Sequence, residues 1–303
     1  MIKIVGIGAN VCDTLITVPS YPKEDTKLRA NTITQSGGGP CATGLVAASK
    51  LGAKCAYIGT LTDDGAGKFL MEDMEKYGVS TEFVGVVPGY TSFSSYICLA
   101  EDEATRTCVF HRGNIPKWSL TDAQKKAIAH AEILMIDGND MAEALEGVRI
   151  AKENGTKVLY DAGGLYEGVE NLLPYADILI PSEEFALGHT KADTPEDAAK
   201  ILFEKYHPEI VVVTQGKEGG ILYDGIEITR YPAFLVDAVD SNGSGDVFHG
   251  AFAFAITSKM SYDKACIFSS GVSALKCTKI GARCGVPTYE ETINFLKENN
   301  YEL

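Results

Sequence analysis

The chain lacks the clustered basic residues and the long apolar runs that mark several large classes of protein. It has 27 Lys and Arg against 41 Asp and Glu, for a net charge of −14. We therefore expect no nucleic acid partner, because phosphate backbones bind clustered basic side chains. No apolar run approaches the roughly 18 residues of a membrane-spanning helix. Residues 1–10 do not resemble a secretory signal, so no membrane association is expected.

Paired cysteine motifs are also missing. The eight cysteines are scattered, mostly within apolar stretches, and contain no Cys-x-x-Cys pair. Structural zinc is therefore not expected, and reduced, buried thiols in a cytoplasmic enzyme are the better interpretation. The five histidines show no metal-ligand spacing, and the sequence has neither an internal repeat nor a low-complexity linker.

The composition and the order of its patterns predict an α/β protein. With 303 residues, 45% of them hydrophobic, the chain can bury a large core as one domain or as one domain with a small appendage. From residue 120 onward, strand patterns alternate with helical patterns, which predicts a mostly parallel sheet covered by helices on both faces. Residues 14–35, 91–100 and 105–111 fall outside this alternation and predict a small β-sheet lid.

Small residues stand between a strand-like segment, 233–239, and an apolar helical run. Gly243, Ser244 and Gly245 have little or no side chain, so their backbone N–H groups can converge on an anion at the helix N-terminus. Asp246 follows them and is placed to take a proton from a hydroxyl that attacks a phosphate. The alternative interpretation is an ordinary capped helix start with an Asp in its first turn.

Two other glycine-containing segments lack the residues of standard nucleotide-binding loops. The segment 6–11 has Val11 where a dinucleotide-binding loop needs its third glycine. The segment 65–68 is flanked by Thr62 and Phe69, where a phosphate loop needs Gly and Ser or Thr. Neither segment is expected to bind a nucleotide.

Candidate ligand contacts follow predicted strands. Asp13 lies just past the first predicted strand, 2–8, where α/β sheets bind ligands; a turn or cap residue is the alternative. The stretch 37–40, three glycines and a proline, opens a helix and permits close approach of a ligand to the backbone, or simply a tight turn. Asp137 and Asn139 end another strand and favour contacts with hydroxyl groups.

Three of these segments together resemble the PfkB, or ribokinase-like, family of carbohydrate kinases, in order and spacing across essentially the whole chain. They are Gly37-Gly38-Gly39-Pro40 before the helix that ends Lys50-Leu51-Gly52-Ala53, Thr214-Gln-Gly-x-x-Gly219, and Asp240-Ser-Asn-Gly-Ser-Gly-Asp246, which is close to the family's Asp-Thr-x-Gly-Ala-Gly-Asp. Segments 21–25, 271–277 and 281–287 are most similar to the ketohexokinase and sulfofructose kinase branches.

The resemblance implies a ribokinase-like fold and a phosphotransferase that uses Mg-ATP, with a monovalent cation such as potassium. The large α/β domain would comprise residues 1–9, 37–87 and 114–303, and the small β lid residues 10–36 and 88–113. The unpaired edge strands of the lid further predict a homodimer formed through it, because exposed strand edges tend to be covered.

The resemblance also implies roles for individual residues. Asp246 would be the catalytic base, and the anion hole would be Gly243, Ser244 and Gly245. The implied sugar contacts are Asp13, Gly38, Gly39 and Thr43, to which Asn139 is added from its place at a strand end. The implied ATP-site residues are Thr214, Gly216, Gly219, Ser182 and Lys276, with residues 271–284 covering the adenine. Glu183 is the implied magnesium residue, and Asp240 and Asn242 the residues for the monovalent cation.

The sequence departs from the family at three places, one of which is the small change from the family's Ala to Ser244. Thr43 stands where the family usually has a sugar-contacting Asn, and 182–185 is Ser-Glu-Glu-Phe where the family has Asn-x-x-Glu. The intact stretch 243–246 nevertheless predicts a sugar kinase, with a neutral ketohexose such as fructose as the expected acceptor. Inward-facing Lys27 and Arg112 would instead favour a phosphate- or sulfonate-bearing sugar.

Two alternatives to a sugar kinase remain open. A nucleoside kinase of the same superfamily would need an aromatic sandwich for a base, for which Tyr90, Phe93 and Tyr96 are candidates, although alternating aromatic residues on a strand more often pack against neighbouring strands. A catalytically silent sugar-binding protein is favoured only by the altered stretch 182–185.

Overall fold

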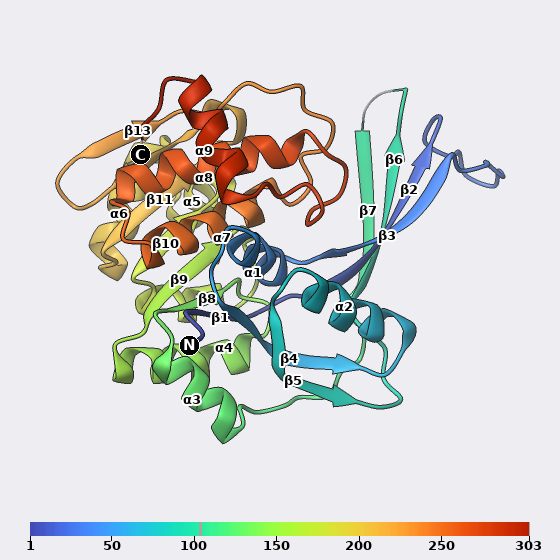
Figure 1. Ribbon diagram of the computed structural model, residues 1–303, viewed down its shortest axis with the longest axis horizontal. Coiled ribbons are helices and arrows are strands. Elements are labelled where there is room, and N and C mark those ends of the chain that lie inside the picture. Colours follow the sequence, from blue (N-terminus) through green and yellow to red (C-terminus); the bar gives the residue numbers. More distant parts are fainter. Residues whose placement is uncertain (103–104, 303) are drawn as a thin grey trace.

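The computed structural model describes residues 1–102 and 105–302, which form a large and a small β-sheet (Figure 1). Residues 103, 104 and 303, which fall within the expected domain ranges, lie outside this description. In the described ranges the large sheet has nine strands in the order β13-β12-β11-β10-β9-β8-β1-β4-β5. They are β1 (Ile4–Ile7), β4 (Cys55–Thr62), β5 (Ser80–Val87), β8 (Ile133–Ile136), β9 (Lys157–Ala162), β10 (Ile178–Pro181), β11 (Ile210–Thr214), β12 (Gly220–Tyr223) and β13 (Ile228–Tyr231).

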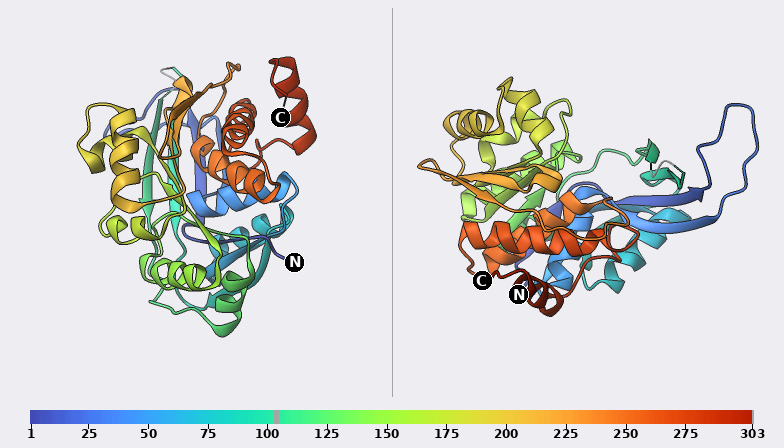
Figure 2. Two further views of the ribbon diagram at one scale, coloured as in Figure 1. Left: turned by 90° about the vertical axis from the view of Figure 1, so that its left-hand side faces the viewer. Right: turned by 90° about the horizontal axis from the view of Figure 1, so that it is seen from above.

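Helices cover both faces of this sheet, as the left view of Figure 2 shows. One face packs against α1 (Pro40–Lys50), α2 (Gly65–Lys76), α7 (Ser244–Thr257), α8 (Tyr262–Cys277) and α9 (Tyr289–Glu298). The other packs against α3 (Asp122–His130), α4 (Met141–Asn154), α5 (Glu183–Thr190) and α6 (Pro195–Tyr206). Short 3₁₀ helices occur at Val169–Asn171, Leu173–Tyr175 and Gly216–Glu218.

The continuous apolar strands are explained by burial on both faces. In β8, Ile133 and Met135 join the core under α1 and α7, while Leu134 and Ile136 join the core under α3 and α4. Successive side chains of a strand point to opposite faces, so a strand buried on both sides needs apolar residues at every position. The expected α/β fold with a doubly covered, mostly parallel sheet is confirmed.

Parallel pairing brings functional segments to one edge of the sheet. Strand β1 pairs in parallel with both β4 and β8, and β8 pairs in parallel with β9. The carboxyl ends of these strands therefore lie together, and they are followed or ended by Ala9, Asp137 and Asp161. The sheet closes at its far edge with the antiparallel hairpin β12–β13, which the sequence did not predict.

The small sheet has the strand order β3-β2-β6-β7 and stands out from one end of the large sheet (Figures 1 and 2). Its strands are β2 (Val11–Val18), β3 (Thr32–Gly38), β6 (Ser94–Ala100) and β7 (Thr105–His111). The expected hairpin at 91–111 is confirmed by the antiparallel pairing of β6 with β7. The segment 19–31 extends farthest from the body, as the right view of Figure 2 shows.

The predicted strand at 233–239 is wrong. After β13 the chain runs irregularly along α8, where the N–H groups of Val239 and Asp240 both donate to the carbonyl of Cys277, at 2.8 and 3.0 Å. Phe234 packs into the core between Phe295 and the C-terminal segment, whereas Leu235 is exposed. The alternating pattern thus reflects packing on helices. No helix within the described ranges is both long and apolar enough to cross a membrane.

Candidate active site

Helix α7 begins at a turn that leaves backbone N–H groups free. Its N-cap, Gly243, has φ = 73°, a left-handed conformation that residues with a side chain adopt only with strain. The N–H of Ser244 is used within the turn, at 3.2 Å from a carbonyl, whereas those of Gly245 and Asp246 have no acceptor among the described residues. Free N–H groups at the positive end of a helix dipole form an anion-binding turn.

The side chain of Asp246 lies in the first turn of α7 and is partly exposed. Burial, together with the nearby charge of Asp161, raises the pKa of Asp246 to about 7, although His249 acts in the opposite direction. A pKa near the working pH suits a group that accepts a proton during a reaction. The environment of Asp246 is therefore compatible with the predicted role of a general base.

His249, one turn after Asp246, ties the anion-binding turn to the sheet. Its Nδ1 lies 2.6 Å from the carbonyl oxygen of Gly245 and 3.3 Å from Oδ2 of Asp161, and its Nε2 lies 3.0 Å from the carbonyl oxygen of Ile180. Burial raises the pKa of Asp161 well above its usual value. The turn is therefore held rigidly against the carboxyl ends of β9 and β10.

A second group of predicted residues meets at the base of the small sheet. The carboxylate of Asp13, in β2, accepts a hydrogen bond from Ser95 Oγ at 2.6 Å, and burial raises its pKa. A side chain at Gly38 would collide with this carboxylate, and Gly39, with φ = 88°, lies against the backbone of Ala9. Asp13, Gly38 and Gly39 thus lie together, as a shared sugar site requires.

Arg283 holds this glycine turn in place. Its guanidinium donates to Asp73 Oδ2 at 2.7 Å, to Asn10 Oδ1 at 2.8 Å and to the carbonyl oxygen of Gly38 at 2.6 Å. The side chain is fully buried and occupies the space that a side chain at Gly37 would need. Arg283 therefore positions the backbone of the glycine turn from behind.

Asp137 is also committed to the backbone. Its carboxylate accepts hydrogen bonds from the N–H groups of Ala9 at 2.8 Å, Cys41 at 3.0 Å and Asn139 at 2.9 Å. It fixes the end of β1 relative to the start of α1, so its oxygens have little capacity left for the hydroxyl contacts expected from the sequence. Asn139 itself lines a cavity.

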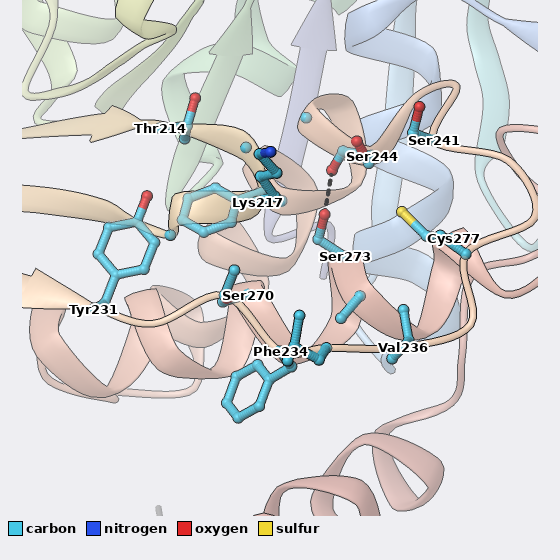
Figure 3. Close-up of a pocket in the computed structure, with 18 residues that line it drawn as sticks. Thr214, Lys217, Tyr231, Phe234, Val236, Ser241, Ser244, Ser270, Ser273 and Cys277 are labelled. Atoms are coloured by element: carbon cyan, nitrogen blue, oxygen red, sulfur yellow. Dashed lines mark hydrogen bonds between the residues drawn. The ribbon is translucent and has the colours of Figure 1, made fainter.

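One cavity, of about 330 Å³, ends at the anion-binding turn (Figure 3). Apolar and aromatic side chains line much of it, among them Tyr231, Phe234, Phe248 and Ala274. The predicted residues Thr214, Gly216 and Gly219 also line it, and Ser244 and Gly245 form its end. Ser273 Oγ, from α8, donates to the carbonyl oxygen of Ser244 at 2.8 Å. An apolar slot that leads to free N–H groups suits a flat ring carrying phosphates.

A second cavity, of about 370 Å³, is lined by residues from five regions of the chain, one of which is Phe93, just before β6. Residues 8–10 follow β1, Thr60 and Leu61 belong to β4, residues 112–118 follow the small sheet, and residues 139–143 open α4. Because residues 8–10 also contact Gly39, this cavity adjoins the Asp13 group. Arg112 lines it, with its guanidinium over the ring of Phe93 at 6.0 Å.

The residues expected to hold a monovalent cation lie beside α7. Asp240 accepts hydrogen bonds from the N–H groups of Asn242 and Gly281, both at 2.8 Å. Lys276, expected in the ATP site, is instead fully buried, and its ammonium donates to the carbonyl oxygen of Asp240 at 2.8 Å. Arg106 of β7 donates to Asn242 Oδ1 at 3.1 Å and so connects the small sheet to this loop.

Four predicted residues line neither cavity, although Ser182 pairs with Thr214, which lines the first. Thr43 is fully buried within α1, and its hydroxyl has no partner in the described chain. Lys27 is exposed in the protruding segment 19–31. Ser182 caps α5 by accepting from the N–H of Phe185 at 3.1 Å, and Glu183 accepts from Gln215 Nε2 at 2.9 Å. Their roles in binding stay predictions.

Sequence reasoning missed Asn10, Arg283 and Glu143. Arg283 lies in a segment used only for its resemblance, and nothing in its neighbours indicates that it is buried. Glu143 stands in the first turn of a helix, where an acidic residue is ordinary. The one available signal was the concentration of polar residues after the strands, which located this edge of the sheet without naming these side chains.

Comparison with known proteins gives consistent similarities. The model of the pfkB family of carbohydrate kinases matches residues 1–289. The ribokinase of Haemophilus influenzae is 27% identical over 297 residues, covering 96% of this chain and 97% of the relative. The ribokinase of Lactococcus lactis is 28% identical over 308 residues, covering both chains in full. The structure of Arabidopsis thaliana ribokinase complexed with ribose and ATP superposes with a TM-score of 0.88 at 24% identity, covering 98% of this chain and 99% of that one.

Proposed function

The chain belongs to the pfkB family of carbohydrate kinases, and on this premise we propose that it transfers the γ-phosphoryl group of Mg-ATP to a hydroxyl of a small neutral sugar. The observation that carries the proposal is the position of Asp246. It follows Ser244 and Gly245, which end the apolar cavity, and it lies beside the free N–H groups of α7 and near the carboxylates that raise its pKa.

Phosphoryl transfer requires a group that accepts a proton and groups that stabilise negative charge, and different residues are proposed for the two roles. Asp246 takes the proton of the attacking hydroxyl, and the N–H groups of Gly245 and Asp246 face the charge on the phosphoryl oxygens. Such catalysis is chiefly positioning and charge stabilisation. In the described ranges no group of three His, Cys, Asp or Glu side chains could hold a metal ion. We propose that magnesium arrives with the ATP phosphates and that Glu183 contacts it through water.

The acceptor is proposed to be a ketohexose such as fructose, with ribose as the rival because the relatives described above are named ribokinases. The test measures ADP release from Mg-ATP across ketohexoses, aldoses, sugar phosphates, sulfofructose and nucleosides. Turnover on one neutral sugar supports the proposal. Turnover on nucleosides alone would identify a nucleoside kinase, and sugar binding without turnover on any acceptor would indicate a silent sugar-binding protein.

The apolar cavity is proposed to hold the adenine of ATP. Replacing Ala274, which lines it, by Phe fills the cavity. The KM for ATP is expected to rise at least about tenfold, a loss of about 1.4 kcal/mol in binding, with the KM for the sugar unchanged. Displacement of a fluorescent ATP analogue checks this directly. Lys264→Phe, an exposed position on the same helix, is the control; equal ATP affinity in the two variants would contradict the assignment.

Potassium is proposed to bind at Asp240, Asn242 and the loop 281–285. Oxygen-rich sites of this kind suit hard cations, so kcat/KM is expected to rise several-fold when potassium chloride replaces choline chloride at constant ionic strength. The Asp240→Asn variant should respond less. An equal rate in choline would reject the cation site, and the Lys276 ammonium, 3.9 Å from Asp240 Oδ2, would then be the positive charge there.

A homodimer through the small sheet is proposed from its outer face. Ile33, Tyr96 and Val109 share one face by register, opposite to Asp13, and are 65%, 55% and 65% exposed. Multi-angle light scattering is expected to give twice the chain mass of 32.5 kDa, and Val109→Glu should give the monomer. The control Ile226→Glu, at an exposed apolar residue in the turn between β12 and β13, should stay dimeric. A monomeric wild type at micromolar concentration would overturn the proposal.

Cytoplasmic localisation stays a proposal. It is supported by the cysteines, all eight of which are free, as expected in a reducing compartment. Cell fractionation that recovers the protein outside the cytoplasm would contradict it.

A further inference from the structure

The second cavity contains a buried carboxylate without a partner. Glu143, in the first turn of α4, lines the cavity, is only 7% exposed, and forms no hydrogen bond or ion pair with any described residue. Its carboxyl oxygens are not among the fully buried side-chain atoms that lack a hydrogen-bond partner, so they face the open space of the cavity. A fold that keeps such a group at a cavity wall provides an acceptor for the hydrogen-bond donors of a ligand.

Asp140 adds a second carboxylate at the same wall. It is the N-cap residue of α4, yet its side chain makes no capping hydrogen bond, which is the usual use of Asp at this position. Burial raises its pKa to about 7, the charges of Asp137 and Glu143 act in the same direction, and the charge of Arg112 acts in the opposite direction. Asp140 and Glu143 therefore present unused carboxyl oxygens to the same space.

The cations of this cavity lie at its rim. Arg112 and Lys117 line it but are both exposed. The guanidinium of Arg112 is further held by aromatic rings, 6.0 Å from Phe93 and 5.8 Å from Tyr166, which satisfies part of its charge. Charges in the buried part act in a lower dielectric than those at the rim. The electrostatic interaction of a bound group with the carboxylates is therefore stronger than its interaction with the exposed cations.

The cavity adjoins the place where phosphoryl transfer is proposed. Residues 8–10 form one of its walls, and the other side of this segment contacts Gly39. Asn10 is bonded through Arg283 to Gly38, whose backbone lies against Asp13. In the proposed arrangement, an acceptor therefore places one hydroxyl near Asp13 and Asp246 and its other end in the second cavity.

We propose that Glu143 and Asp140 form an acceptor subsite that binds an uncharged group through its O–H or N–H donors and rejects a phosphate or sulfonate. This proposal rests on the proposed kinase function and names the residues that would make a neutral acceptor preferred over an anionic one. The hydroxyls of a free sugar and the amino group of a nucleoside base present the same donor chemistry, and the acceptor panel distinguishes them. Lys27 is exposed and is not among the residues that line this cavity.

The experiment compares Glu143→Gln with the wild type on the best neutral acceptor and on a phosphorylated form of the same sugar. Loss of a charge-assisted hydrogen bond is expected to lower kcat/KM for the neutral acceptor about tenfold or more, mainly through KM. The kcat/KM ratio of phosphorylated to neutral acceptor should rise by at least the same factor. Asp140→Asn should act in the same direction.

Glu146→Gln is the matched control. Glu146 lies one turn along α4 and makes a surface ion pair with Lys125 at 2.7 Å, so its loss should leave both acceptors unaffected. Calorimetric titration of the neutral acceptor without ATP provides a readout that does not need turnover. Weaker binding of the neutral acceptor to Glu143→Gln than to Glu146→Gln supports the subsite, whether or not any acceptor is phosphorylated. A lack of phosphorylation of every acceptor would refute only the kinase proposal.

Two results would overturn the subsite. One is a wild-type enzyme that prefers a sugar phosphate or sulfofructose, which leaves the kinase function standing. The other is a Glu143→Gln variant, folded by circular dichroism, whose acceptor affinity and acceptor preference match those of Glu146→Gln.

Discussion

Replacing Asp246 by Asn is expected to lower kcat by about 10²–10⁴-fold, the usual contribution of a general base, while making the folded protein more stable above pH 7. The activity falls because Asn has the shape of Asp but takes no proton. The stability rises because an amide avoids the cost of a buried negative charge among Asp161 and its neighbours, the cost that raises the pKa of Asp246 to about 7.

The pH dependence of stability separates this effect from a general change in packing. The pKa of Asp246 is raised from 3.8 to about 7 on folding, so its carboxyl stabilises the fold fully below pH 3.8 and loses this contribution as the pH rises to about 7. The melting temperature of Asp246→Asn minus that of the wild type should therefore increase between pH 4 and pH 8. In the wild type, kcat/KM should fall as the pH drops below about 7, because the base must be deprotonated to accept a proton.

Asp263→Asn is the matched control, because Asp263 lies in the first turn of α8 and away from both cavities. Its pKa is lowered from 3.8, chiefly by a hydrogen bond with Ser261, so its stabilisation is present above pH 3.8 and lost as the pH falls. This variant should keep its activity and lose stability at neutral pH. Its stability change is therefore opposite in sign to that of Asp246→Asn. A threefold or smaller drop in kcat for Asp246→Asn would reject its role as base.

Replacing Arg283 by Met is expected to lower the free energy of unfolding by about 3–5 kcal/mol, the usual cost of breaking a buried ion pair. The substitution leaves Asp73, itself buried, without its 2.7 Å partner and removes the bonds to Asn10 and to the Gly38 carbonyl. Because the glycine turn loses its support, the KM for the acceptor should also rise. Urea unfolding measured by circular dichroism gives the stability change.

The double variant Arg283→Met with Asp73→Asn isolates the buried charge. Removing both partners should restore part of the lost stability, because no uncompensated charge remains. Arg149→Met, at an exposed position of α4, should stay within about 0.5 kcal/mol of the wild type. Two results would contradict a stabilising role for this ion pair. One is a double variant whose free energy of unfolding is as low as that of Arg283→Met. The other is an Arg283→Met variant whose free energy of unfolding equals that of the wild type.

Features that depend on neighbouring residues were predicted well. The helix after Gly39-Pro40, the buried strand 133–136 and the turn 243–246 are each encoded by spacing within one segment. The segment 233–239 shows the limit of the same method. Its apolar alternation is the pattern of a strand, but Pro232 has no N–H to offer a sheet, and the backbone beyond it bonds to α8 instead.

By itself, the sequence determined the α/β class, the small sheet and the glycine turn that begins α7, because local spacing and the order of elements carry that information. It also made Asp246 the candidate base, a role that stays a prediction. Only the tertiary structure decided which distant side chains meet. Arg283 reaches Asp73 and Asn10 across 210 and 273 residues of chain, and Glu143 is buried because residues 8–10 and 112–118 enclose the start of α4. Periodicity reports which face of an element is apolar. Burial of a charge and its loss of partners depend on the packing of several elements, which no single segment of sequence records.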